Sequence, residues 1–215
     1  MANTNRPFGF RPVGTLAGAS VSGGTRMYAI PTADTSNSYA IGDVVMSLAS
    51  SDATGIPFVQ KWGGVATTSA LPLGIIVGIQ TADATTSLVG VALSLEQTYI
   101  NAGTRTSVRY VWVDDNPLCT FTAQFDSTAI VVADLHKNCA VTVSASVVQT
   151  PTSQYSTMVL TSPAVTATLP IRLIGAVQDT KNEIGAYVRC FCKWNYHEYG
   201  VTSGASGTIV SYLAA

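Results

Sequence analysis

The chain has 215 residues, of which 47% are hydrophobic and only 11% are charged, and its net charge is -1. This length suits one large β domain or two small ones, and the apolar share is sufficient for a sizeable core. The charged share is less than half of that usual in a globular domain, and a nearly uncharged surface favours association. We therefore expect an assembly to cover much of the surface. A secreted β protein with a Ser/Thr-rich surface is the alternative.

The 11 basic residues are not concentrated in any stretch of the sequence. Binding to nucleic acid or to a membrane surface depends on such a concentration, so we expect neither partner. The start, MANTNRPFGF, lacks the pattern of a signal peptide, and no apolar stretch approaches the ~20 residues that span a bilayer. We expect synthesis in a cytoplasm, where the four cysteines are thiols rather than disulfides.

The first segment, residues 1–25, is expected to be an extended arm. Burial of Phe8 and Phe10 returns roughly 1.5–3 kcal/mol each, whereas ordering the backbone costs ~1–2 kcal/mol per residue. The arm therefore orders only if its backbone joins a sheet and its side chains fill pockets, in its own domain or on another subunit. We favour docking on a neighbouring subunit.

Strand patterns dominate the first β-rich half, residues 26–114. The stretch PLGIIVGIQ alternates at period two, and its glycines allow another backbone to approach. It is expected to place on one face Leu73, Ile75, Val77 and Ile79. The stretch RYVWVDD likewise sets Val111 and Val113 apart from Tyr110 and Trp112.

The second β-rich half, residues 115–200, pairs with the first as two units or as one interleaved domain. One or two helical turns are expected near Ala133–Lys137, and another within ALSLEQTYINAG. The stretch GAYVRCFCKWNYH places on one face Val188, Cys190, Cys192 and Trp194. Residues 201–215 form a Gly/Ser-rich tail with a short apolar end. The fold class predicted is mainly β, with a barrel-like or sandwich domain.

Cys190 and Cys192 are the strongest candidates for a metal site, because two thiols at this spacing lie on one face of a strand. A zinc site needs about four ligands, and these two cysteines share their face with Val188 and Trp194. Burial as small apolar side chains is the favoured interpretation. We expect no metal and no cofactor.

No catalytic residue is predicted, and we do not expect an enzyme. The phosphate-binding glycine motifs and the G-x-S-x-G elbow of α/β hydrolases are missing from the sequence. A small hydrolase or a carbohydrate binder stays open as a minor alternative. It would be favoured if a histidine met one of three acids, Asp114, Asp134 or Glu198, in one cleft.

Several stretches resemble the head decoration, or cement, proteins of tailed bacteriophages. The arm matches through the pattern Pro-x-Gly-x-Arg-Pro-Val, and the resemblance continues over most of the chain through loose structural motifs. The matching positions are Pro7, Gly9, Arg11, Pro12 and Val13, followed by residues 41–45, 71–79, 115–126, 133–142 and 169–200. The Cys190/Cys192 pair departs from the pattern of this family.

The resemblance implies a barrel-like or β-tulip fold and a homotrimer at the three-fold and quasi-three-fold positions of an icosahedral head. It implies the major capsid protein as the partner and the outer surface of the virion as the location, after assembly in the host cytoplasm. A tail or receptor-binding component is the second choice. The expected binding residues are Phe8, Phe10, Arg11 and Pro12 of the arm, and exposed members of the group Phe191, Tyr196 and Tyr199.

Overall fold

The structure is a computed structural model of the 215-residue chain. It describes residues 3–19, 24–64, 70–80, 98–143, 148–150, 153–200, 202–203 and 209–210. The fold is mainly β, with 45% strand and 2% helix, which confirms the predicted class. In this described part of the chain, no helix has the length and apolar character needed to cross a bilayer.

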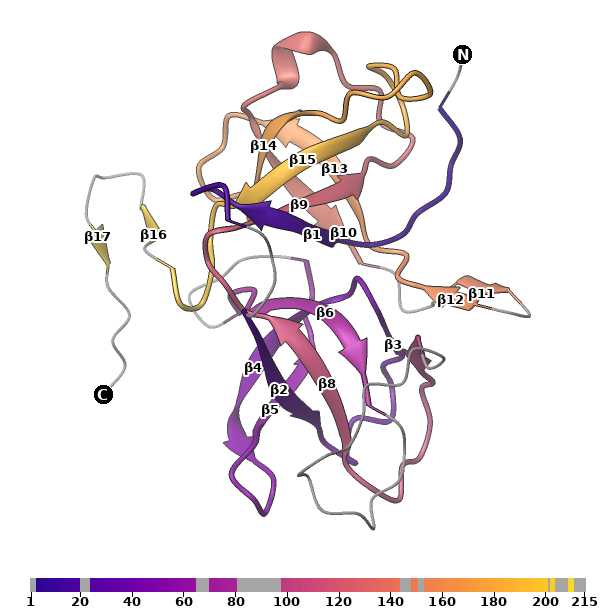
Figure 1. Ribbon diagram of the computed structural model, residues 1–215, viewed down its shortest axis with the longest axis vertical. Coiled ribbons are helices and arrows are strands. Elements are labelled where there is room, and N and C mark those ends of the chain that lie inside the picture. The colour runs from indigo at the N-terminus through magenta and orange to yellow at the C-terminus, as the bar shows by residue number, and fades with distance from the viewer. Residues whose placement is uncertain are drawn as a thin grey trace.

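Five strands form a small closed barrel in the order β2-β5-β4-β6-β8 (Figure 1, lower body). Its interior is aliphatic and aromatic, with Ile76, Val111 and Val113 completely buried. A two-stranded ladder of β3 (Tyr39–Ala40) and β7 (Tyr99–Ile100) lies beside it. The barrel strands are β2 (Thr25–Ile30), β4 (Val44–Ser51), β5 (Pro57–Lys61), β6 (Gly74–Ile79) and β8 (Arg109–Asp114).

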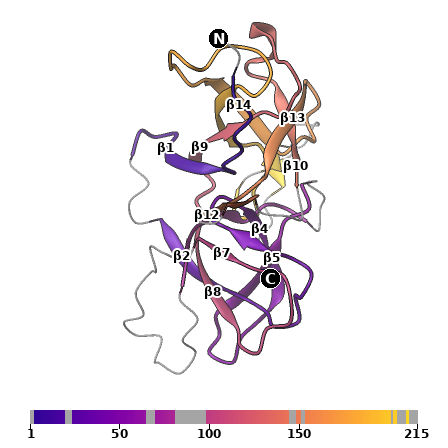
Figure 2. The same cartoon turned by 90° about the vertical axis from the view of Figure 1, so that its right-hand side faces the viewer.

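Six strands form the second body, a curved sheet in the order β1-β9-β15-β14-β10-β13. The curvature brings opposite sides of the sheet together, since Phe125, just beyond β9, bridges to Leu160 of β13. Figure 2 shows the two bodies stacked along the long axis. The strands are β1 (Arg11–Thr15), β9 (Cys119–Gln124), β10 (Asn138–Thr142), β13 (Val159–Ala164), β14 (Ile171–Ala176) and β15 (Arg189–Trp194).

The remaining elements are short. A 3-10 turn at Val132–Asp134 lies where one or two helical turns were expected. Two small hairpins are formed by β11 (Val148–Thr150) with β12 (Ser153–Tyr155), and by β16 (Thr202–Ser203) with β17 (Ile209–Val210). Half of the stretch ALSLEQTYINAG, where a further turn was expected, and most of the tail lie outside the described residues. The described half of that stretch, from Thr98, contains β7 and a bend and no helical turn.

The alternation predicted for β15 is confirmed: Cys190, Cys192 and Trp194 are buried, and the residues between them are half-buried. The face predicted for β6 is wrong. The pairing of β6 with β8 shifts register between Ile76 and Gly78, and Ile75 packs into the core of the sheet while Ile76 lies inside the barrel. A bulge of this kind exchanges the two faces of a strand, so strict alternation does not hold across it.

The arm becomes part of the sheet of its own chain. Its strand β1 pairs antiparallel with β9, and Pro12 is tolerated because β1 is an edge strand. Phe10 is only 1% exposed, and its ring meets that of Phe121 edge to face at 5.3 Å. The expectation that Phe10 anchors the chain on a neighbouring subunit is therefore wrong, because its apolar surface is already covered by its own core.

The arm reaches this core by passing directly over the barrel. Gly9 and Gly42 both have positive φ, and a Cβ on Gly9 would lie 2.5 Å from the Gly42 carbonyl oxygen. The amide of Phe10 donates to that same oxygen at 2.9 Å. Only glycine permits two backbones to approach so closely in this conformation.

We expect Phe10→Ala to destabilise the protein by about 3–5 kcal/mol, the usual cost of removing a fully buried phenylalanine. Urea unfolding followed by tryptophan fluorescence measures this. Leu16→Ala is the control, because Leu16 is 49% exposed and its truncation should cost less than about 0.5 kcal/mol. Equal unfolding midpoints for the two variants would contradict the intramolecular placement of Phe10.

Candidate partner-binding surface

The structure brings two of the predicted binding residues together on the outer face of the sheet. Arg11 of β1 and Phe191 of β15 are both register partners of Thr122, which lies on the strand between them. Phe8 is half-buried, and the Arg11 guanidinium lies 4.9 Å from the centre of its ring. Pro12 is half-buried next to Arg11.

Tyr196 and Tyr199 lie elsewhere, beyond the end of β15, and do not join this face. Tyr199 is 52% exposed, but its hydroxyl lies 3.4 Å from that of Tyr28 on the barrel. The Tyr28 hydroxyl in turn donates to Asp115 at 2.7 Å. Tyr199 therefore contributes to the contact between the barrel and the sheet. The predicted group of Phe191, Tyr196 and Tyr199 does not form a single surface.

A pocket of about 430 Å³ lies between the arm and the 177–189 segment. Four of the 11 basic residues of the chain line it: Arg6, Arg11, Lys181 and Arg189. We call this the cationic pocket. Sequence reasoning missed it, because its basic residues come from both ends of the chain and no local stretch is basic.

The arm is fixed along one wall of the cationic pocket by side-chain hydrogen bonds. The Asn3 amide donates to the carbonyls of Glu183 at 2.7 Å and Ala186 at 2.8 Å. The side-chain Nε2 of Gln124 donates to the Thr4 carbonyl at 2.9 Å, and its Oε1 accepts from the backbone amide of Arg6 at 3.0 Å. The pocket wall is thus formed by contacts within the folded chain.

One of the four cations is paired. Arg189 donates to Asp179 at 2.5 Å, and this hydrogen bond holds the pKa of the Asp179 carboxyl below its usual range. Arg6, Arg11 and Lys181 make no ion pair with the described residues. The pocket therefore carries an excess of positive charge in a protein whose net charge is -1.

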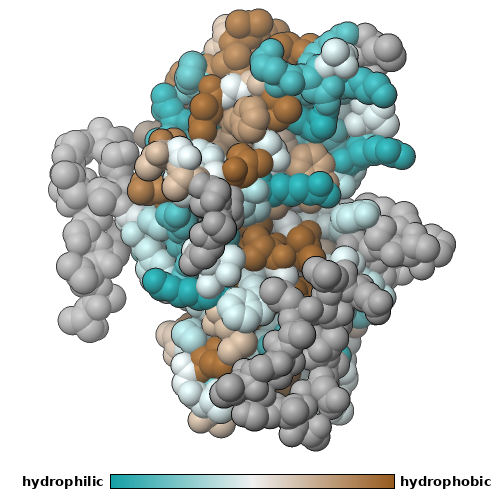
Figure 3. All heavy atoms as spheres, viewed as in Figure 1, coloured by the Kyte–Doolittle hydropathy of each residue, from teal (hydrophilic) through white to brown (hydrophobic). Residues whose placement is uncertain are grey.

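The outer face of the sheet extends this positive region. Lys193 lies on the same side of β15 as Arg189, and its register partner on β14 is the exposed Arg172. Figure 3 shows hydrophilic residues gathered over the arm and the beginning of β15. Six of the 11 basic residues thus belong to one face, although the sequence shows no basic stretch.

Exposed apolar side chains lie at the end of the molecule next to this face. Val131 is 57% exposed, Val132 is 70% exposed, and Ile184 is 38% exposed. The two segments are neighbours, because the Ile130 amide donates to the Gly185 carbonyl at 3.3 Å. We call these three residues the apolar end, and Figure 3 shows hydrophobic residues at the top of the molecule, where Figure 1 places the 3-10 turn.

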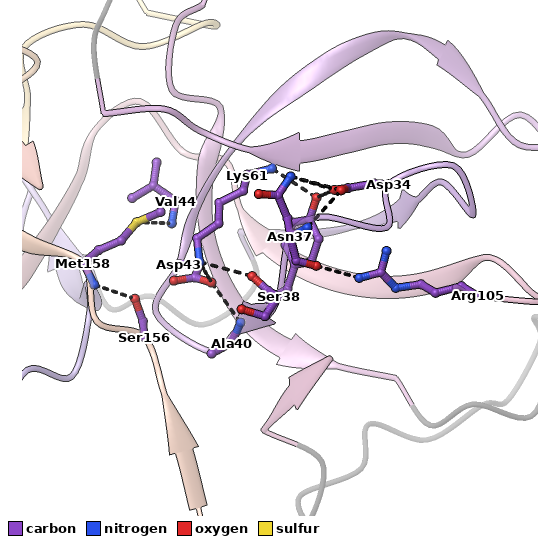
Figure 4. A network of polar contacts seen from close by, with 11 residues as sticks. Asp34, Asn37, Ser38, Ala40, Asp43, Val44, Lys61, Arg105, Ser156 and Met158 are labelled. Carbon is purple, nitrogen blue, oxygen red and sulfur yellow. Dashed lines mark hydrogen bonds and ion pairs between the residues drawn. The ribbon is translucent and has the colours of Figure 1, made fainter. Parts of the chain in front are cut away.

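A second pocket, of about 600 Å³, is lined by residues 99–109. Its Arg105 donates to the Asn37 carbonyl at 2.7 Å (Figure 4) and to the Asn101 carbonyl at 2.9 Å. The guanidinium of Arg105 is thus partly occupied in holding neighbouring loops together.

The cysteines are all buried free thiols. Burial raises the pKa of Cys190 to about 12 and that of Cys192 well above its ordinary value. No group of three or more potential metal ligands occurs among the described residues. Cys190 and Cys192 pack in the core of the sheet with Trp194, as the apolar interpretation predicted.

We expect none of the four cysteines to react with Ellman's reagent in the native protein at pH 8, because the thiolate is the reactive form and burial disfavours it. All four should react in guanidinium chloride. Rapid native reaction of even one thiol would show that the core of the sheet opens readily or that a cysteine is accessible.

The acids named for the hydrolase alternative do not converge. Asp114 accepts from the Cys119 thiol at 3.3 Å, Asp134 pairs with Lys137 at 2.8 Å, and Glu198 accepts from the Ser47 hydroxyl. Each of the three carboxylates is thus engaged with a different side chain, and none of these partners is a histidine. A carbohydrate binder would also expose aromatic rings to stack on a sugar, but Trp62 and Trp194 are core residues at 0% and 5% exposure.

His197 is buried at the junction between the sheet and the barrel. It is 2% exposed, its Nδ1 accepts from the Tyr199 amide at 3.1 Å, and its ring lies 5.6 Å from that of Trp194. Burial lowers the pKa of His197 from 6.5 to about 4, although the Leu73 carbonyl opposes the shift. His197 is therefore neutral in the folded protein at physiological pH.

The lowered pKa of His197 makes folding sensitive to acid. The unfolded chain takes up this proton near pH 6.5 and the folded chain only near pH 4, so the stability contributed by neutral His197 is complete above pH 6.5 and is lost as the pH falls toward 4. Over this pH range we expect the free energy of unfolding of wild type to fall by up to about 3 kcal/mol more than that of His197→Gln. Urea unfolding at several pH values measures the difference, and parallel pH profiles would refute it.

Comparison with protein-family models, with curated proteins and with solved structures finds no significant match to this chain.

Proposed function

We propose that this protein is a virion structural protein that binds the outer surface of an icosahedral bacteriophage capsid and stabilises it, as a homotrimer at three-fold and quasi-three-fold positions. The proposal starts from the sequence resemblance to cement proteins. Its partners are the major capsid protein and two further copies of the chain. It requires no catalytic residue, metal or cofactor.

The observation that carries the proposal is the apolar end. Val131, Val132 and Ile184 are exposed together on a chain in which only 11% of residues are charged. Isolated exposed apolar residues are common, but grouped ones beside a polar rim are typical of protein interfaces. An interface at this end would cover the apolar side chains and use the cationic pocket beside them.

A cement protein acts by binding the assembled shell more tightly than the separated subunits. Each copy that spans two capsid subunits favours the assembled state by the free energy of its own binding. At a free concentration 100 times the Kd, this amounts to about 2.7 kcal/mol for each site. Repetition over a shell with many such sites would resist the internal pressure of packaged DNA.

We expect the purified protein to bind expanded heads that lack it, with saturation at a fixed number of copies per capsid protein, and to raise the temperature at which the heads release their DNA. Co-sedimentation and a fluorescent DNA stain measure the two effects. Absence of binding to heads would refute the proposal, and binding only to tails would favour the tail component instead.

A matched pair of variants tests the interface. Val131→Ser with Val132→Ser should weaken head binding, whereas Leu118→Ser, at the opposite end of β9 and 52% exposed, should not. Both changes affect exposed side chains, so neither should lower stability by more than about 0.5 kcal/mol per residue. Equal effects of the two variants on head binding would mean that the apolar end is not the interface.

A further inference from the structure

The cationic pocket is formed by the folded monomer, yet three of its four cations form no ion pair with the part of the chain that the structure describes. Arg6, Arg11 and Lys181 make no ion pair with the described residues, and only Arg189 is held by a carboxylate. Arginine side chains bind carboxylates and phosphates through two parallel hydrogen bonds. A ligand that matches this pocket would therefore carry negative charge.

The wall opposite the arm is held in an unusual conformation. Tyr187 has φ of 58°, a left-handed conformation that is uncommon for tyrosine, and its side chain lines the pocket. The backbone of Tyr187 is fixed on both sides, since its amide donates to the Asp126 carbonyl at 3.0 Å and its carbonyl accepts from Gln124 at 3.0 Å. Gln124 also holds the arm, so the same side chain supports both walls.

One feature favours a protein segment over a nucleic acid as the ligand. Val131, Val132 and Ile184 are exposed on two segments that meet beside the pocket, since the Ile130 amide donates to the Gly185 carbonyl and Asn182 and Tyr187 line the pocket. A sugar-phosphate backbone bound to the cations offers no apolar group to cover these three side chains. A peptide can place a carboxylate on the cations and an apolar side chain on the apolar end, and a volume of about 430 Å³ suits a few side chains.

We propose that the cationic pocket binds an acidic segment of a partner protein, with carboxylates at Arg6, Arg11 and Lys181 and an adjacent apolar side chain on the apolar end. This deepens the proposed function and rests on it for the identity of the partner, which would be the capsid surface. The binding chemistry is independent of that identity and is measurable without heads.

The test compares two double variants that remove the same charge from the same face. Arg6→Gln with Lys181→Gln neutralises the pocket, whereas Arg172→Gln with Lys193→Gln neutralises the neighbouring part of the sheet. Arg6, Arg172 and Lys181 are exposed and Lys193 is half-buried, and unchanged melting temperatures would establish that both variants are folded. Because both variants lose the same charge, any difference in their binding of a ligand then depends on where on this face the charge was removed.

The probe is a fluorescein-labelled peptide of alternating Glu-Glu-Leu units, followed by fluorescence anisotropy, with a single-stranded oligonucleotide of equal charge as the comparison. We expect wild type to prefer the peptide, the pocket variant to bind it about tenfold or more weakly, and the control variant to stay within about threefold. Equal losses in the two variants would overturn the proposal, as would tighter binding of the oligonucleotide or no binding of the peptide.

The same variants applied to expanded heads separate the two proposals. If wild type binds the peptide but not the heads, the proposed peptide site is supported and the proposed capsid function is refuted. If wild type binds heads and both double variants bind equally well, the capsid function stands and the pocket does not contribute to it.

Discussion

The close passage of the arm over the barrel is the contact on which the rest of the structure depends. The carbonyl of Gly42 accepts from Phe10, and the amide of Gly42 donates to the carbonyl of Ile76 at 2.8 Å. A single residue thus joins the arm to strand β6. Phe10 enters the core of the sheet because this crossing positions it there, and β1 then continues along β9 to close one edge of the sheet.

The same region contains a buried ion pair within the barrel, close to where the barrel meets the sheet. Lys61 and Asp43 are 3.1 Å apart with side chains 4% and 0% exposed, and Lys61 also donates to the Ser38 carbonyl at 3.1 Å (Figure 4). Val44, next to Asp43, donates its amide to the sulfur of Met158 in the sheet at 3.2 Å. Desolvation makes such a pair a poor source of net stability, but either partner left alone would be costly. Its effect is to hold the turn before β4 against the end of β5, and the amide of Val44 then contacts Met158 from this fixed turn.

The candidate binding surface follows from this arrangement. Once β1 is fixed on β9, the preceding residues run along the edge of the sheet, and Arg6 and Arg11 face Lys181 and Arg189. A charge distribution that is diffuse in sequence becomes concentrated on one face. The exposed valines of the 3-10 turn lie beside it, so one end of the molecule combines positive charge with apolar surface.

The sequence by itself determined the β class, the alternation of β15 and the apolar character of the buried cysteines, because these depend on period-two patterns within a single strand. It also identified the 3-10 region and the need of the arm for a sheet to join. Tertiary structure alone decided which sheet that was, since the answer depends on Gly9 meeting Gly42, more than thirty positions apart. It likewise decided the bulge in β6 and the cationic pocket, because pairing register and the convergence of distant side chains are properties of packing between strands rather than of any local stretch.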